Sequence, residues 1–322
     1  MKEQGGAAER QGSLRVVFTS SQIPRTMKAV RSSLLPRLAA LSAVVLWGIS
    51  FVATKTALRE ISPITLIFTR FALGTTVLFL ILKIRRESPV PPKDALPSLA
   101  LMGFIGVFVH QMLQVHGLTL TTAIRTGWLI GLIPIWSAVL SALMLHERFG
   151  IRKVFGLLLG TVGAVVVITR GEFSSRVLAL PTTAGDLLIL ASTVNFAIYT
   201  IMGRSTLKRL GSAKATAAAM LAGWAMLIPF FVRNAGWREY VLLSSAGWGA
   251  VVFLGVGCSG LGYLFWYAAL ERIETSKVAA FLHLEPLVTL IAAVIVLGEP
   301  VVLSTAVGGV LVLAGVYSVQ RA

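Results

Sequence analysis

Two stretches of this sequence carry the same landmarks, PIWSAVLSALMLHE at residues 134–147 and PLVTLIAAVIVLGE at residues 286–299. Each begins with a proline, continues through apolar residues and ends on a glutamate. Further pairs fall on the same offset of 152 residues: Gly103/Gly255, Leu118/Leu270, Gly156/Gly308 and Gly163/Gly315. Because prolines, acids and glycines would rarely align in one register by chance, the sequence contains an internal repeat.

The composition excludes an ordinary soluble protein. Of the 322 residues, 56% are hydrophobic and 13% are charged, against about 25% charged in soluble proteins. The mean hydropathy of +0.83 leaves too few polar side chains to cover a surface in water. The net charge of +16 would suggest nucleic acid if the basic residues formed one face, but they lie between apolar runs, so we expect a lipid bilayer and no nucleic acid as partner.

Ten apolar runs have about the 20-residue length that a membrane-spanning helix needs. They cover residues 38–57, 64–82, 98–116, 123–145, 154–170, 185–203, 215–232, 247–267, 276–297 and 304–320. The runs are continuously apolar, whereas barrel strands alternate, so helices are predicted. The predicted fold class is an all-α polytopic membrane protein with ten transmembrane helices.

The repeat and the helix count together predict an inverted architecture. Five helices fall in each copy, and because five is odd, the second copy must cross the membrane in the opposite sense. Of the 29 Lys and Arg residues, five lie in loops predicted on one side, three lie within helices, and the remainder lie on the side of both termini. Since positive charge is retained in the cytoplasm, both termini are predicted there.

Three regions follow from this pattern. Residues 1–36 are polar and basic and are predicted to be a disordered cytoplasmic tail, within which Met27 could be the true start. Residues 37–170 form the first five-helix repeat and residues 184–320 the second. Inverted repeats are the architecture of alternating-access carriers, so the pattern favours transport over a non-transporting scaffold.

The motifs of both copies resemble the EamA family of the drug/metabolite transporter superfamily. The resemblance covers residues 38–320 and rests on the following segments: Leu46–Phe51, Ser62-Pro63 with Arg70-Phe71, Pro134 to Glu147 with Gly156 and Gly163, Leu284-Glu285-Pro286, and Leu297-Gly298-Glu299 with Gly308 and Gly315. One departure is Asn195-Phe196-Ala197, where the family often has Trp before Ala, which puts an inherited substrate assignment in doubt.

The resemblance implies a secondary active transporter of the bacterial inner membrane that exports a small metabolite such as an amino acid, often against a proton gradient. It also implies that helices one to four and six to nine line the cavity. The alternative within transport is an exchanger of anionic solutes, of the sugar-phosphate or nucleotide-sugar type. That class needs several cations in the cavity, whereas this membrane interior offers chiefly Arg70 and Lys55.

Polar and aromatic side chains within the helices are the candidate substrate-binding residues. His110 and Gln114 share one face of the third helix, although hydrogen bonds between helices would explain them equally. The other candidates are Trp47, Trp128, Asn195, Tyr199 and His283. An aromatic wall with few polar groups suits an apolar metabolite, but most aromatic residues at such positions pack in the core.

Glu285 is the candidate proton-coupling residue, because ionisable groups at membrane depth are rare and usually face a cavity or a partner. The alternative is a structural role, in which Glu285 pairs with Arg272 or Lys277 at the interface or merely supports Pro286. Pro134 and Pro286 are predicted as hinges, since a proline near mid-helix frees the carbonyl four residues earlier. Arg70 is better explained as a structural contact, and a substrate carboxylate is its alternative partner.

No catalytic activity, cofactor or metal is predicted. The sequence lacks a nucleotide-binding loop and the common hydrolase motifs, so an ion or solute gradient must drive transport. The single cysteine, Cys258, excludes an intrachain disulfide framework and a multi-cysteine metal site. Gly156 and Gly160 form a small-residue face that could serve a homodimer.

Overall fold

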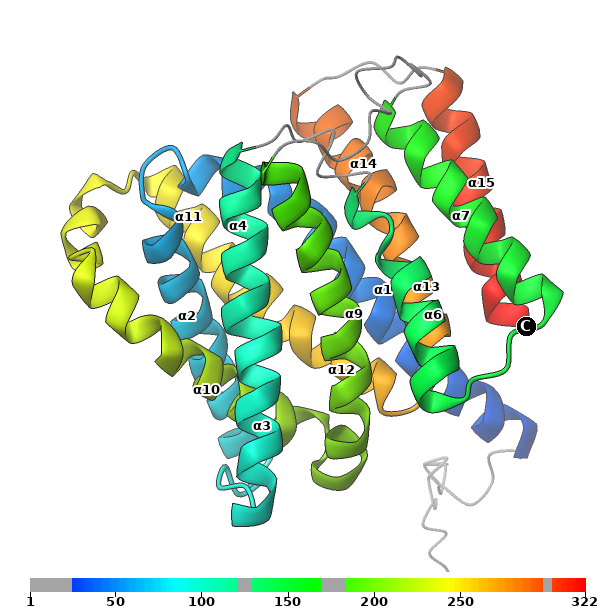
Figure 1. Ribbon diagram of the computed structural model, residues 1–322, viewed down its shortest axis with the longest axis horizontal. Helices are drawn as coiled ribbons and strands as arrows, with labels where there is room; N and C mark the ends of the chain where they lie inside the picture. The colour runs from blue at the N-terminus through cyan, green and yellow to red at the C-terminus, as the bar shows by residue number, and fades with distance from the viewer. Residues whose placement is uncertain (1–24, 121–128, 170–183, 298–302) are drawn as a thin grey trace, which may run out of the picture.

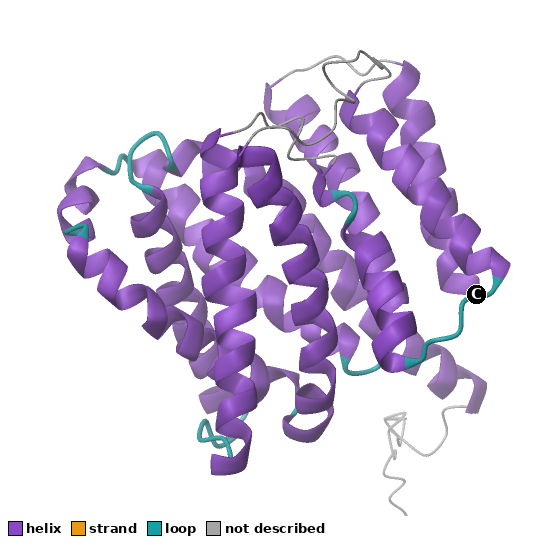
Figure 2. Cartoon of the chain, in the orientation of Figure 1, coloured by secondary structure: helices purple, strands orange, loops and turns teal. Residues whose placement is uncertain are grey.

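The computed structural model describes residues 25–120, 129–169, 184–297 and 303–322, and every regular element in these ranges is helical (Figures 1 and 2). The first half holds α1 (Arg25–Ala57), α2 (Pro63–Ile84), η1 (Lys93–Ala95), α3 (Leu96–Gly103), η2 (Phe104–Val109), α4 (His110–Leu120), α6 (Ile133–Leu145) and α7 (Ile151–Thr169). The second half holds α9 (Ala184–Leu210), α10 (Ser212–Arg233), η3 (Gly236–Leu242), α11 (Ser245–Val252), η4 (Phe253–Gly262), α12 (Tyr263–Leu270), α13 (Thr275–Ala280), η5 (Phe281–Leu284), α14 (Glu285–Leu297) and α15 (Leu303–Arg321).

Several neighbouring elements continue one another and form single long helices. Within the described residues, seven segments are long and apolar enough to cross a membrane: Leu34–Ala57, Pro63–Ile84, Lys93–Leu120, Ala184–Leu210, Ser212–Arg233, Ser245–Leu270 and Thr275–Ala292. The stretches Ile133–Leu145 and Ala306–Arg321 are apolar but shorter. The predicted class, an all-helical membrane protein, is therefore confirmed, whereas the count of ten helices stays a prediction.

The N-terminal boundary differs from the sequence prediction. Helix α1 begins at Arg25, so residues 25–36, which were assigned to a disordered tail, are helical. Pro36 lies inside this helix. Arg37 donates its Nε proton to Oε1 of Gln320 over 3.1 Å, which ties the early part of α1 to the end of α15. Residues 1–24 lie outside the described residues.

Helices α7 and α15 pack side by side in opposite directions along glycine faces (Figure 1). A Cβ on Gly156 would lie 2.8 Å from the carbonyl oxygen of Gly315, and one on Gly163 would lie 2.7 Å from that of Gly308. Gly156 and Gly308 are repeat equivalents, as are Gly163 and Gly315. The contact is therefore reciprocal between equivalent helices, and the Gly156 face predicted for a homodimer is occupied by α15 of the same chain.

A π-helical segment interrupts the third helix of each repeat at nearly equivalent positions. The first is η2 and the second is η4, and each directly follows or includes one glycine of the Gly103/Gly255 pair. Gly103 packs on Ala219 and Gly223 of α10, and Gly255 packs on Leu73 and the Arg70 carbonyl of α2. Each repeat thus packs its third helix on the second helix of the other copy.

The two repeated prolines start helical segments rather than kinking regular ones. Pro134 lies in the first turn of α6, after a turn at residues 131–132. Pro286 is the second residue of α14 and follows the 3-10 turn η5. Proline costs no helical hydrogen bond in a first turn, so the expectation of a mid-helix kink is corrected to a break in the helix just before each proline.

Candidate functional site

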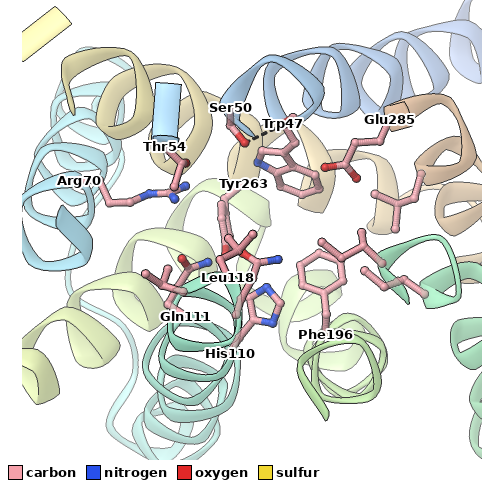
Figure 3. A pocket seen from close by; sticks show the side chains of 15 residues that line it. Trp47, Ser50, Thr54, Arg70, His110, Gln111, Leu118, Phe196, Tyr263 and Glu285 are labelled. Carbon is pink, nitrogen blue, oxygen red and sulfur yellow. Dashed lines mark hydrogen bonds between the residues drawn. The ribbon is translucent and has the colours of Figure 1, made fainter. Parts of the chain in front are cut away.

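A small pocket lies between α1, α2, α4, α9, α12 and the two stretches of chain around Pro134 and Pro286 (Figure 3). Its described lining residues are Trp47, Ser50, Thr54, Arg70, His110, Gln111, Gln114, Val115, Leu118, Ile130, Ile133, Phe196, Tyr263, Leu282 and Glu285. The cavity volume is about 60 Å³, and a water needs about 10–15 Å³ of such volume. The pocket in this conformation therefore suits one small solute group.

The pocket lies where the two repeats meet. Three pairs of lining residues are separated by the repeat offset of 152: Gln111/Tyr263, Ile130/Leu282 and Ile133/Glu285. Equivalent positions of both copies therefore face one cavity. The last pair breaks the chemical symmetry, because one copy supplies an isoleucine where the other supplies a carboxylate.

Arg70 projects from α2 towards the pocket in Figure 3. Its side chain is 6% exposed, and its Nε proton is donated to Oγ of Ser259 over 3.0 Å. Within the described residues no carboxylate forms an ion pair with it. The structural contact expected from the sequence is therefore a hydrogen bond to η4 and not an ion pair, and the ligand contact stays a prediction.

Glu285 begins α14 and lies across the pocket from Arg70 in Figure 3. Its side chain is 7% exposed, and no cation of the described residues lies within ion-pair distance. Arg272 and Lys277, the partners that a purely structural role would use, do not reach it. A carboxylate at the first residue of a helix is favoured by the helix dipole, and its oxygens remain available to the cavity.

Three of the predicted substrate-binding residues line this pocket. His110 donates a hydrogen bond from its Nδ1–H to the Ser192 carbonyl over 3.2 Å. Its ring lies 5.0 Å from that of Phe196. Trp47 donates from Nε1 to the Cys258 carbonyl over 3.1 Å, so η4 fixes the indole. Gln114 completes this group.

Three other predicted residues lie elsewhere. Asn195 donates from Nδ2 to the Ile105 carbonyl of η2 over 2.7 Å. The Tyr199 ring packs against Gly106 and Tyr267. His283 bonds Thr161 through Nε2 over 2.9 Å. Each joins helices and is not among the lining residues of this pocket, so its role in substrate binding stays a prediction. Trp128 lies outside the described residues.

The sequence interpretation missed several lining residues, chiefly Ser50, Thr54, Phe196 and Tyr263, and it did not assign Gln111 to the site. Small hydroxyls and aromatic residues are common in membrane helices, so their identity alone carries little signal. The repeat offset could have found Tyr263 and Gln111, since these two are equivalent. Phe196 lies next to Asn195, which drew attention because of its polarity.

A polar network joins three helices at the other end of the bundle, where α6 and α9 end and α13 begins. The Glu147 carboxylate accepts hydrogen bonds from Arg204 Nη1 at 2.7 Å, Thr275 N at 2.9 Å, Ser276 N at 3.3 Å and Ser276 Oγ at 2.6 Å. Lys153 adds an ion pair to Glu274 at 2.7 Å. We call these residues, Glu147, Lys153, Arg204, Glu274, Thr275 and Ser276, the Glu147 network.

The network holds Glu147 in its charged form. Burial raises the pKa of this carboxyl, but hydrogen bonds from Ser276 and Thr275 and the charge of Lys153 outweigh it, so the net pKa lies below the ordinary 4.5. A lowered carboxyl pKa stabilises the folded contact fully above pH 4.5 and loses that effect as the pH falls through the shifted value. The network therefore keeps its charged carboxylate at neutral pH.

Comparison with known proteins agrees with this arrangement of apolar helices around a polar pocket, which is that of a membrane transporter. The EamA-like transporter family matches residues 35–169 and, again, residues 183–320. The chain belongs to this family, and it is an integral membrane protein. The resemblance inferred from the sequence motifs is thereby confirmed.

Relatives and solved structures give the same picture. An uncharacterized transporter of Archaeoglobus fulgidus is 34% identical over 281 residues, which cover 86% of this chain and 96% of the relative. A probable terminal-alkyne amino-acid exporter of Streptantibioticus cattleyicolor is 28% identical over 86% of this chain and 91% of its own. A crystal structure with 20% identity matches 91% of this chain and 97% of its own at a TM-score of 0.73, which concerns the fold alone.

Proposed function

We propose that this protein is a secondary active transporter that exports a small metabolite such as an amino acid across the bacterial inner membrane. Ten helices in two inverted five-helix repeats would alternate the pocket between the two sides. The observation that carries the proposal is the pocket itself, because its lining combines equivalent residues of both repeats. Transporters of this architecture place their substrate at the repeat interface.

Two further contacts support inversion. Equivalent helices α7 and α15 pack antiparallel through reciprocal glycine contacts, and the third helix of each repeat packs on the second helix of the other. Both patterns arise when two copies of one module are related by a twofold axis in the membrane plane. The helix breaks before Pro134 and Pro286 are the hinges of the proposed motion.

The proposed alternating access needs one side closed while the other is open. The Glu147 network joins α6, α9 and α13 at the end opposite Leu118, a pocket residue near the end of α4. The excess of Lys and Arg assigns the Glu147 end to the cytoplasm. This conformation would then be closed on the cytoplasmic side.

Cysteine labelling tests the orientation. With Cys258 replaced by Ala, single cysteines at Arg59 and Lys208, both exposed, should react with an impermeant maleimide from opposite sides of the membrane. Arg59→Cys should label in intact cells and Lys208→Cys only after permeabilisation. Equal labelling of both from one side would refute the inverted arrangement.

Proton coupling through Glu285 predicts a specific loss. Glu285→Gln keeps the shape but cannot exchange a proton, so uptake driven by a pH gradient in proteoliposomes should fall at least about 10-fold, whereas exchange of solute against solute should persist. Asp94→Asn, at an exposed carboxylate outside both the pocket and the Glu147 network, is the matched control. Full gradient-driven flux in Glu285→Gln would remove the coupling role.

An amino-acid panel in the same proteoliposomes tests the function itself. Counterflow of labelled amino acids is expected, and a scaffold would show none. An exchanger of sugar phosphates would instead accelerate with phosphate esters. The pocket disfavours that alternative, because Arg70 is the one Lys or Arg among its described lining residues. Whether two copies pair as a homodimer stays a proposal.

A further inference from the structure

Arg70 has hydrogen-bonding capacity that the described protein does not use. A guanidinium carries five N–H donors, and Ser259 receives one of them, from Nε. The two Nη groups have no hydrogen-bond partner among the described residues. Because arginine stays charged, and because a buried charge without a counterion is costly, this side chain is suited to an anion that enters the pocket.

We infer that Arg70 binds the carboxylate of the transported solute and thereby restricts transport to carboxylate-bearing molecules. The inference rests on the proposed transport function and names the group that this site recognises. The planar fork of arginine matches a carboxylate through two parallel hydrogen bonds. On the opposite wall, the Trp47 ring suits the positive end of a zwitterion.

Charge favours a carboxylate over a phosphate ester. A single fixed cation balances one negative charge, whereas a phosphate dianion would leave a net charge in a site of low dielectric. Ile130, Ile133 and Leu282 provide the apolar lining that an aliphatic side chain needs.

The helix contacts around Arg70 fix its direction. A Cβ on Gly74 would lie 2.7 Å from Cβ of Ser259, and one on Gly255 would lie 3.1 Å from the Arg70 carbonyl. These close approaches of α2 and η4 hold Ser259 against Nε, which leaves the Nη groups directed away from that contact. In the other repeat, the position equivalent to Arg70 is Ala222, which packs against Gly103. At this pair of equivalent positions, one copy therefore carries a cation and the other does not.

Ligand-induced stabilisation of the purified full chain in detergent tests this recognition. The probes are leucine, 3-methylbutylamine, 4-methylpentanoate and glycerol phosphate. We expect leucine to raise the unfolding temperature most, 4-methylpentanoate less, and the amine and phosphate not at all. Arg70→Gln should weaken leucine binding about 10- to 100-fold. Arg70→Lys keeps the positive charge, so it should lose less leucine affinity, and it serves as the control for a folding defect.

Arg238→Gln, at an exposed arginine outside the pocket, is the matched control and should bind leucine as the wild type does. The inference is overturned if 3-methylbutylamine binds as well as leucine or if Arg70→Gln keeps the wild-type affinity for leucine. It is also overturned if glycerol phosphate is the one probe that binds, or if none of the four probes stabilises the protein. Leucine binding without flux in proteoliposomes would refute the transport proposal and leave the Arg70 assignment standing. If the amine were transported as fast as leucine, the transport proposal would stand and the Arg70 assignment would be refuted.

Discussion

Glu147→Gln should open the end of the bundle at which the Glu147 network joins α6, α9 and α13. The substitution removes the charge that pairs with Arg204 while leaving that cation largely buried, at 17% exposure. Breaking one partner of a buried ion pair costs about 3–5 kcal/mol. It also weakens the hydrogen bonds that Glu147 accepts from the first backbone amides of α13. The closed conformation should lose most of its population.

Thiol accessibility measures this opening. Thr200 is fully buried and lies one helical turn from Arg204 on α9. In a background with Cys258 replaced by Ala, Thr200→Cys should react slowly with an impermeant maleimide from the Glu147 end, and Glu147→Gln should raise that rate at least about 10-fold. Acidification below pH 4.5 should act in the same direction, whereas changes between pH 6 and 8 should not.

Asp94→Asn is the control for this experiment. Its carboxylate is 67% exposed and pairs with Arg209, which is 52% exposed, and such solvent-exposed pairs contribute about 1 kcal/mol or less. The labelling rate should therefore stay close to that of the parent. An unchanged rate in Glu147→Gln itself would mean that the network does not close this end.

Gly103→Ala should destabilise the protein severely. A Cβ at this position would overlap the Ala219 carbonyl oxygen and lie 2.7 Å from the Gly223 amide nitrogen. Both obstacles are backbone atoms, so helices α3 and α10 would have to separate instead of one side chain rotating. Overpacking of this kind costs about 3 kcal/mol or more. The unfolding temperature in detergent and the yield of folded protein should both fall.

Gly249→Ala is the matched substitution. Gly249 is exposed within α11, and a Cβ there meets no atom within 4 Å. Alanine favours a helix interior by about 0.5–1 kcal/mol over glycine, so this variant should be as stable as the parent or slightly more stable. If Gly103→Ala unfolded at the same temperature as Gly249→Ala, the close α3–α10 packing would be wrong.

The candidate site was only partly predictable. Trp47, His110, Gln114 and Glu285 line the pocket, and a polar or aromatic residue in an apolar run was enough to single them out. Asn195 and His283 gave the same signal but bond neighbouring helices. In lipid, a polar side chain can meet its hydrogen-bonding need at a cavity or at another helix, and sequence does not distinguish the two.

The sequence by itself determined the membrane environment, the helical class and the repeat, because apolar run length and register depend on residues close along the chain. Only the tertiary structure decided which face of each helix meets the pocket. It also decided that the glycine faces of α7 and α15 pack against each other and that Glu147 joins α9 and α13. These outcomes depend on the rotation and packing of helices far apart in sequence. A cation such as Arg70 can be recognised as unpaired only when all its neighbours in space are known.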